Sequence, residues 1–204
     1  TRGESLSRLF AGWDLTKEIE LVFSNPLDTF YAEKFLLKQD TSQNIIVPEI
    51  KIDPLKKQKL LIRYNWLPAK NYILKMEAGA TKDIFGLAND TASFFLFTKK
   101  TEDYGSIILN IKNTSPDDLI LQFMEQDMTL ISETFIPSNT SPGLTFSNTL
   151  PSKYIFRVIK DKNKNGSWDT GDLSQKKQPE QILFYPAEVT TKANWEVELK
   201  WKIE

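Results

Sequence analysis

The stretch NWEVELKWKIE, from Asn194 to Glu204, alternates strictly between apolar and charged side chains. Its apolar positions are Trp195, Val197, Leu199, Trp201 and Ile203. Successive side chains of a β-strand point to opposite faces of a sheet, so this period of two predicts a strand with one buried and one wet face. Such a division is typical of an antiparallel sheet with water on one side. We therefore expect these apolar side chains, both tryptophans included, to lie in a core.

Strand patterns continue through most of the chain, and helical patterns are almost absent. They cover residues 18–23, 59–66, 71–76, 92–98, 107–111, 119–124, 128–135 and 154–159, and a less regular first strand is expected near Leu9 to Trp13. Turn-forming pairs such as Asn25-Pro26 and Leu150-Pro151 separate these runs. Many short strands with such punctuation are typical of β-sandwiches, so the predicted fold class is all-β.

The length of 204 residues is long for one β-sandwich of about 100 residues and comfortable for two. Near Lys99 to Gly105 the apolar pattern stops and then resumes with a new strand. We therefore predict two tandem β-sandwich domains, over residues 1–100 and 104–204.

The composition argues against several classes of function. Lys and Arg number 26 against 27 Asp and Glu, and the net charge of -1 provides no field that attracts nucleic acid, so we expect no nucleic-acid partner. No Cys is present to act as a thiol nucleophile, and no His is present for a Ser-His-Asp triad or a His-ligated metal. We predict that the chain is not an enzyme and has no catalytic residue and no organic cofactor.

The segment from Tyr72 to Asp90, YILKMEAGATKDIFGLAND, is followed by the predicted strand from Ala92 to Thr98. It resembles the late part of bacterial Ig-like domains of the SbsA type, which carry a strand, a turn of small residues and a DxxGN-style segment before the last strand. Leu87 departs from that pattern, because the family has Asn after the glycine. The resemblance covers about residues 5–99 and implies an Ig-like first domain.

Three segments of the second half carry another resemblance: YIFRVIKDKNKNGSWDTGD from Tyr154, QPE from Gln178, and ANWEVELKW from Ala193. Together they look like the prealbumin-like or carboxypeptidase-regulatory-like β-sandwiches that follow Ig-like modules in bacterial envelope lipoproteins. The resemblance implies a cell-envelope location, in the periplasm or on the outer surface. It also implies a structural or spacer role beside other domains of the same polypeptide. A ligand-binding module for carbohydrate, or for adhesion to a surface protein, is the alternative.

The sequence begins Thr1-Arg2-Gly3, without an initiator Met or an apolar signal run, and contains no apolar run long enough to span a bilayer. We therefore read it as a piece of a longer protein and expect a lipid anchor in a missing N-terminal segment.

One polar loop carries a motif with metal chemistry. Counting from Asp161, oxygen-bearing side chains fall at positions 1, 3, 5, 9 and 12. The predicted ligands are Asp161, Asn163, Asn165, Asp169, Asp172 and the Ser167 carbonyl at position 7. This is the order of ligands in an EF-hand calcium loop, with Gly166 at the turn position and Asp in place of the last Glu. The flanking patterns are those of strands rather than helices, so a calcium loop here would be grafted onto a hairpin.

Two interpretations of this loop stay open. It is either a weak structural Ca²⁺ site, with affinity near the ~10⁻⁴ to 10⁻³ M of extracellular modules, or a solvated turn at Asn165-Gly166.

Two further groups of residues suggest a function, but each also has a purely structural explanation. Glu180 with Glu196 or Glu198 could form an acid/base pair, but Glu196 and Glu198 fall on the wet face of their strand. Trp13, Trp66 and Trp168 could line a sugar platform, but for Trp168, which lies inside the polar loop, we favour cover for the end of the sheet.

Overall fold

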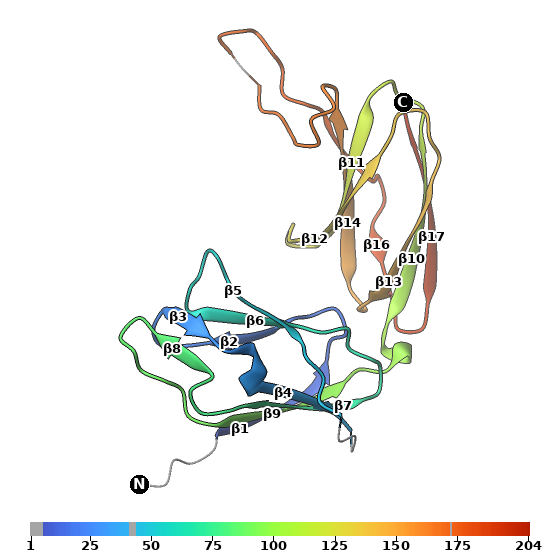
Figure 1. Ribbon diagram of the computed structural model, residues 1–204. Coiled ribbons are helices and arrows are strands. Elements are labelled where there is room, and N and C mark those ends of the chain that lie inside the picture. Colours follow the sequence, from blue (N-terminus) through green and yellow to red (C-terminus); the bar gives the residue numbers. More distant parts are fainter. Residues whose placement is uncertain (1–5, 41–43, 172) are drawn as a thin grey trace. The chain divides into compact units, whose positions relative to one another are not determined.

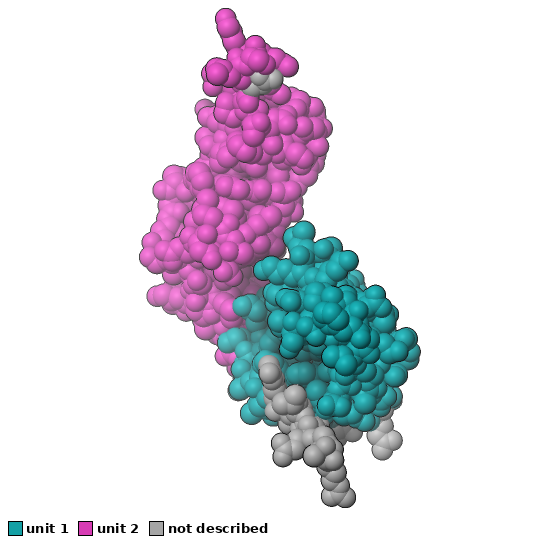
Figure 2. All heavy atoms as spheres, turned by 90° about the vertical axis from the view of Figure 1, so that its left-hand side faces the viewer, with its two compact units in different colours: residues 1–101 teal, residues 102–204 magenta. Residues whose placement is uncertain are grey.

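The computed structural model of the chain describes residues 6–40, 44–171 and 173–204 (Figure 1). Strands make up 52% of the chain and helices 3%, which confirms the predicted all-β class. The chain divides into two compact units, residues 1–101 and residues 102–204, which Figure 2 shows in different colours. Each unit is described by itself below. In the described part of the chain, no helix is long and apolar enough to cross a membrane.

Unit 1 is a two-layer sandwich. Its strands are β1 (Leu6–Trp13), β2 (Ile19–Val22), β3 (Leu27–Phe30), β4 (Phe35–Gln39), β5 (Glu49–Ile52), β6 (Lys59–Arg63), β7 (Asn71–Met76), β8 (Thr81–Asp83) and β9 (Ala92–Thr98), with a 3-10 helix η1 (Ala32–Lys34). One sheet has the order β1-β9-β7-β4, a second has the order β2-β6-β5, and β3 pairs with β8. The alternating apolar positions of both larger sheets meet in one core, where the rings of Trp66 and Tyr72 lie 5.0 Å apart.

Unit 2 is a second sandwich. After a 3-10 helix η2 (Thr101–Asp103), its strands are β10 (Gly105–Asn113), β11 (Asp118–Glu125), β12 (Leu130–Ile136), β13 (Gly143–Thr149), β14 (Lys153–Asp161), β15 (Ile182–Phe184), β16 (Val189–Thr190) and β17 (Glu196–Ile203). One sheet has the order β13-β10-β17, and the other has the order β12-β11-β14-β15, with β16 also on β14. The core between them contains Phe123, whose ring lies 4.8 Å from Phe156 and 4.7 Å from Phe146.

The first and last strands of each unit lie side by side. Strand β1 pairs in parallel with β9, and β10 pairs in parallel with β17, whereas the other described ladders between strands are antiparallel. Each unit therefore ties its own two ends together by backbone hydrogen bonds, as expected of a sandwich that closes on itself.

The C-terminal strand is confirmed with two corrections. It pairs in parallel with β10 at the edge of its sheet, rather than in the antiparallel arrangement that its alternation suggested. Leu199, Trp201 and Ile203 are buried as the period predicts, but Trp195 is 60% exposed. The cause is a turn directly before β17: the Trp195 N–H donates to the Lys192 carbonyl at 3.2 Å, and Asn194 has a φ of 58°. The strand begins only at Glu196. The apolar–polar alternation of the sequence therefore starts one residue before the backbone becomes a strand.

Because each unit has its own core and ties its own ends, we predict that residues 1–101 and 102–204 fold when produced separately. Circular dichroism should show a β spectrum and a cooperative thermal transition for each piece. If either piece were unfolded alone and recovered structure only on mixing with the other, the two units would be parts of one folding domain.

Candidate metal site

The polar loop starts at the last residue of β14. Asp161 is fully buried, and its carboxylate accepts two backbone hydrogen bonds, from the Asn165 N–H at 3.1 Å and from the Gly166 N–H at 2.8 Å. The chain can fold back over this carboxylate because Lys164 and Gly166 have φ values of 59° and 75°, in the left-handed region that glycine adopts at no steric cost. Position 1 of the predicted calcium loop thus fixes the backbone at positions 5 and 6.

Three more of the predicted ligands come together beside it. Asn163 donates its side-chain amide to the Asp169 carboxylate, and the Asn165 amide donates to both Asp169 oxygens at 3.2 Å. The Lys177 Nζ lies 3.7 Å from the same carboxylate. The amide oxygens of both asparagines accept loop backbone N–H groups, from Asn165 at 3.2 Å and from Ser167 at 2.8 Å. The structure therefore brings the amide nitrogens of positions 3 and 5 to the carboxylate at position 9, while the oxygens of both amides accept backbone N–H groups.

The remaining predicted ligands are less informative. Ser167 is exposed and its N–H is held by Asn165. Asp172 lies outside the described residues. Within residues 6–40, 44–171 and 173–204, no three acidic side chains form a group that could hold a metal ion. The oxygen donors of the loop are of the kind that Ca²⁺ takes, carboxylates and amide carbonyls, and a metal here would rest mainly on two described carboxylates, Asp161 and Asp169.

Sequence reasoning missed the residue that holds the two limbs of the loop together. Glu180 is buried, and its carboxylate accepts the Lys162 N–H at 2.9 Å and the Asp169 N–H at 3.1 Å. Its carbonyl accepts the Trp168 Nε1–H at 3.2 Å, which places this half-exposed ring beside the loop. Glu180 is therefore a structural residue, because both of its carboxylate oxygens accept loop N–H groups. A lone acid after Gln178-Pro179 was the only signal in the sequence.

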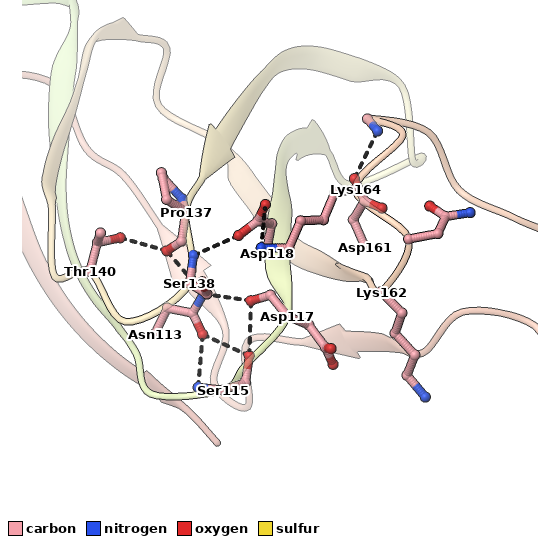
Figure 3. Close-up of polar contacts among 12 residues, drawn as sticks. Asn113, Ser115, Asp117, Asp118, Pro137, Ser138, Thr140, Asp161, Lys162 and Lys164 are labelled. Atoms are coloured by element: carbon pink, nitrogen blue, oxygen red, sulfur yellow. Dashed lines mark hydrogen bonds and ion pairs between the residues drawn. The ribbon is translucent and has the colours of Figure 1, made fainter.

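A second buried acid faces the loop from the neighbouring strand. Asp118 on β11 is the direct cross-strand partner of Asp161 on β14. Like charges directly opposite each other in a sheet repel, so each needs its own partners. Asp118 accepts the Ser138 N–H at 2.8 Å, and the Lys164 Nζ lies 3.6 Å from its other oxygen (Figure 3). Lys164 of the loop thus places its ammonium group beside Asp118, at the end of the sheet where the loop begins.

Asn113 completes the polar end of the sandwich. It is buried, and its amide donates to the carbonyls of Asp117 at 3.0 Å and Pro137 at 3.2 Å (Figure 3). Its side-chain oxygen accepts the Ser115 N–H at 3.1 Å and the Ser115 hydroxyl at 2.8 Å. One side chain therefore links the β10–β11 turn to the end of β12.

In unit 1, the DxxG segment is also held by a carboxylate that accepts backbone N–H groups. Asp83 accepts the N–H groups of Phe85 and Leu87, each at 2.9 Å, and the Asn25 amide at 2.7 Å. The Asn25 hydrogen bond is the main cause that lowers the pKa of Asp83 below its usual value, and both backbone N–H groups add to it. Asn89 accepts the Thr81 N–H at 2.7 Å. The residues that carry the Ig-like resemblance are thus turn-holding residues.

The tryptophans do not support the sugar platform that the sequence left open. Trp66 is buried in the core of unit 1, with its Nε1–H on the Lys17 carbonyl at 2.9 Å. Trp13 is partly buried against the same core, 5.5 Å from the Phe10 ring. Both side chains therefore serve packing.

Comparison with known proteins gives no family. No family model matches the chain, and no curated protein matches it. The major pilin subunit BcpA of Bacillus cereus is similar at 12% identity and a TM-score of 0.34, over 96% of this chain and 66% of that structure. A variant of the same pilin matches at 13% identity and a TM-score of 0.32, over 94% of this chain and 60% of that structure. A candidate cell adhesion protein of Bacteroides fragilis matches at 7% identity and a TM-score of 0.23, over 98% of this chain and 93% of that one.

The chain thus spans slightly less than two thirds of the length of the two pilin structures. Similarities this low carry no argument about function. The family and the role of the chain therefore have to be argued from its own residues.

We predict that Glu180→Ala destabilises unit 2 by about 1–3 kcal/mol, because it removes a charged acceptor that holds the Lys162 and Asp169 N–H groups. Glu196→Ala is the matched control, since Glu196 is exposed on β17 and should change stability by less than about 0.5 kcal/mol. Urea denaturation followed by tryptophan fluorescence measures both. Equal effects of the two substitutions would contradict the role given to Glu180.

Proposed function

We propose that the chain is a non-catalytic structural module of a bacterial cell-envelope protein, in which two β-sandwich domains hold other domains of the same polypeptide apart. One observation supports this most directly. The four buried carboxylates of the described residues are Asp14, Asp118, Asp161 and Glu180, and each accepts at least one backbone N–H. Carboxylates that hold turns in this way are committed to the fold rather than presented to a substrate.

The exposed acids are consistent with the same role. Glu196 and Glu198 lie on the polar face of β17, where Lys200 approaches Glu198 at 3.9 Å. A catalytic pair of carboxylates needs two acids that face each other across a bound substrate. Acids spread over a solvated sheet serve solubility and weak surface ion pairing instead.

The finer family assignment belongs to the same proposal. We assign unit 1 to the SbsA-type Ig-like domains, on the DxxG segment held by Asp83, and unit 2 to the prealbumin-like or carboxypeptidase-regulatory-like sandwiches, on the loop held by Asp161 and Glu180. The accompanying location is the bacterial envelope, with a lipid anchor outside this sequence.

We also propose that the loop of unit 2 binds Ca²⁺ as a structural ion. Asp161, Asn163, Asn165 and Asp169 would supply side-chain oxygens, with the Ser167 carbonyl and Asp172 completing the set. The proximity of Asn163 and Asn165 to Asp169 supports this, and ion binding would require both amides to turn their oxygens toward the ion in place of the N–H groups that now donate to Asp169. The bound ion would neutralise carboxylates that now depend on amide N–H groups and on the Lys177 ammonium.

The absence of turnover is the first test of the proposal. The chain should not hydrolyse a panel of glycosides and peptides above the rate of buffer. Hydrolysis that disappears in Glu180→Gln or in Asp161→Asn would contradict the structural role and assign a catalytic one.

Calcium should stabilise unit 2. A loop with a Kd of about 1 mM would gain roughly 1.4 kcal/mol at about 10 mM Ca²⁺, because the ion binds the folded state alone. Differential scanning calorimetry should therefore show a rise in Tm with Ca²⁺ and a smaller rise with Mg²⁺, which demands tighter octahedral geometry.

Three substitutions test the calcium effect, and two of them, Asp169→Asn and Lys162→Ala, leave the backbone contacts of Asp161 in place. Asp169→Asn keeps the size of the side chain but removes a ligand charge, and it should abolish most of the calcium effect, as should Asp161→Ala. Lys162→Ala removes a cation from the loop and should preserve or enhance the effect. If calorimetry shows no heat of binding up to several millimolar Ca²⁺, with an unchanged Tm, the loop is a solvated turn.

A further inference from the structure

Strand β11 is buried on both of its faces. Leu119, Leu121 and Phe123 point into the core of unit 2, while Ile120 and Met124 point to the opposite, outer face of the sheet and are also buried. Strands that are apolar on both faces are expected where both sides of a sheet are covered. The outer face of β17 in the other sheet is different, because Glu198, Lys200 and Lys202 occupy it. Unit 2 therefore has one polar outer face and one apolar outer face.

The strand register arranges the apolar outer face in rows, since cross-strand partners lie on the same face. One row across β12, β11 and β14 consists of Phe135, Ile120 and Ile159, and another consists of Leu130, Met124 and Ile155. Phe135 is 52% exposed and Leu130 is 50% exposed, and Phe184 on β15, beside Arg157, is 51% exposed. Large apolar side chains with half of their surface in water, gathered on one sheet face, mark an interaction surface.

Between these two rows lies a polar row that carries opposite charges at its ends. Gln122 donates its amide to Glu133 on β12 at 2.7 Å and accepts the Arg157 Nε–H from β14. Among the described residues, neither Glu133 nor Arg157 forms an ion pair. The row therefore runs from a negative end through a neutral amide to a positive end, about 10 Å apart at two strand spacings.

We propose that this outer face of β12, β11 and β14 binds the same face of a second copy of the chain, about a two-fold axis parallel to β11. This axis places β12 of one copy over β14 of the other. Each row of side chains then faces the same row of the second copy. Glu133 of one copy then lies over Arg157 of the other, twice, and the half-exposed Phe135 and Leu130 of each copy lie over the β14 side of the other. The inference goes beyond the structural role proposed above and does not depend on calcium.

The charge pattern favours the axis parallel to β11 and favours a second copy of the chain as the partner. A two-fold axis across the strands would place Glu133 over Glu133 and Arg157 over Arg157, which is repulsive. A face that is self-complementary under only one of its two in-plane axes specifies an isologous contact between identical copies. Sheets stacked face to face lie about 10 Å apart, a distance that Glu and Arg side chains can bridge from opposite sides.

The size of the face sets the expected strength. Three strands at about 4.8 Å and three rows at roughly 7 Å give a footprint of roughly 300 Å² per copy. This is below the ~800 Å² per partner of a standard stable interface, so the dimer should be weak and concentration-dependent. Its ion pairs should also make it weaker at high salt.

Sedimentation equilibrium of the full chain from about 10 µM to 1 mM tests the proposal. The wild type should pass from monomer to dimer over this range, with a larger dissociation constant at high salt. Glu133→Arg and Arg157→Glu should each weaken dimerisation at least tenfold, because like charges then face each other. An equimolar mixture of these two variants should form a heterodimer, and the double variant with both substitutions should dimerise again.

Two controls keep the result interpretable. Glu198→Arg reverses a charge on the polar outer face of β17 and should leave the dissociation constant unchanged. Concentration-dependent amide shifts of the unmodified chain, measured by NMR, should map to β11, β12 and β14 rather than to β10, β13 and β17. A wild type that stays monomeric up to 1 mM, single reversals that dimerise like the wild type, or amide shifts confined to the other sheet would each overturn the proposal.

Discussion

Backbone N–H groups need acceptors where strands end, and this chain supplies them with buried carboxylates. Asp161 at the end of β14 accepts two loop amides, and Glu180 accepts two more from the other side of the same loop. A hydrogen bond to a charged acceptor contributes about 1.5–3 kcal/mol, so a loop held by four such bonds has a fixed backbone. The strands that frame it depend on this closure.

The same constraint explains why the chain contains acids at positions that first suggest chemistry. Asp118 and Asp161 are direct cross-strand partners, an arrangement that repels unless each charge is satisfied separately. The Ser138 N–H and Lys164 satisfy Asp118, while the loop amides satisfy Asp161. A calcium ion in the loop would add to this arrangement by relieving the Asp169 carboxylate. The turn geometry does not require the ion, since the Asp161 and Glu180 contacts are made by the protein alone.

The alternation of apolar residues predicts most of this fold. Strands β7 and β9 match their predicted ranges, because period-two patterns with one buried face leave little choice of register. The error at Trp195 has a local cause, a turn that ends the backbone alternation one residue before the sequence alternation. The outer face of β11 also escaped prediction: a continuous apolar run identifies a strand, but only the register with β12 and β14 shows that Glu133, Gln122 and Arg157 form one row.

The motif predicts the ligand role of Asn163, Asn165 and Asp169, and that role stays a prediction. The structure shows that the three side chains are neighbours, with both amides donating to Asp169. Glu180 is distant in sequence from the loop start and has no motif of its own, so only the folded chain shows its contacts.

The central claim is that carboxylates fix this loop through its backbone, and amide hydrogen exchange tests it most directly. With no metal added, the N–H groups of Lys162, Asn165, Gly166 and Asp169 should exchange at least tenfold more slowly than the exposed N–H groups of Trp168 and Thr170 in the same loop. Exchange of all six at the rate of an unstructured peptide would contradict the account and make the loop a solvated turn.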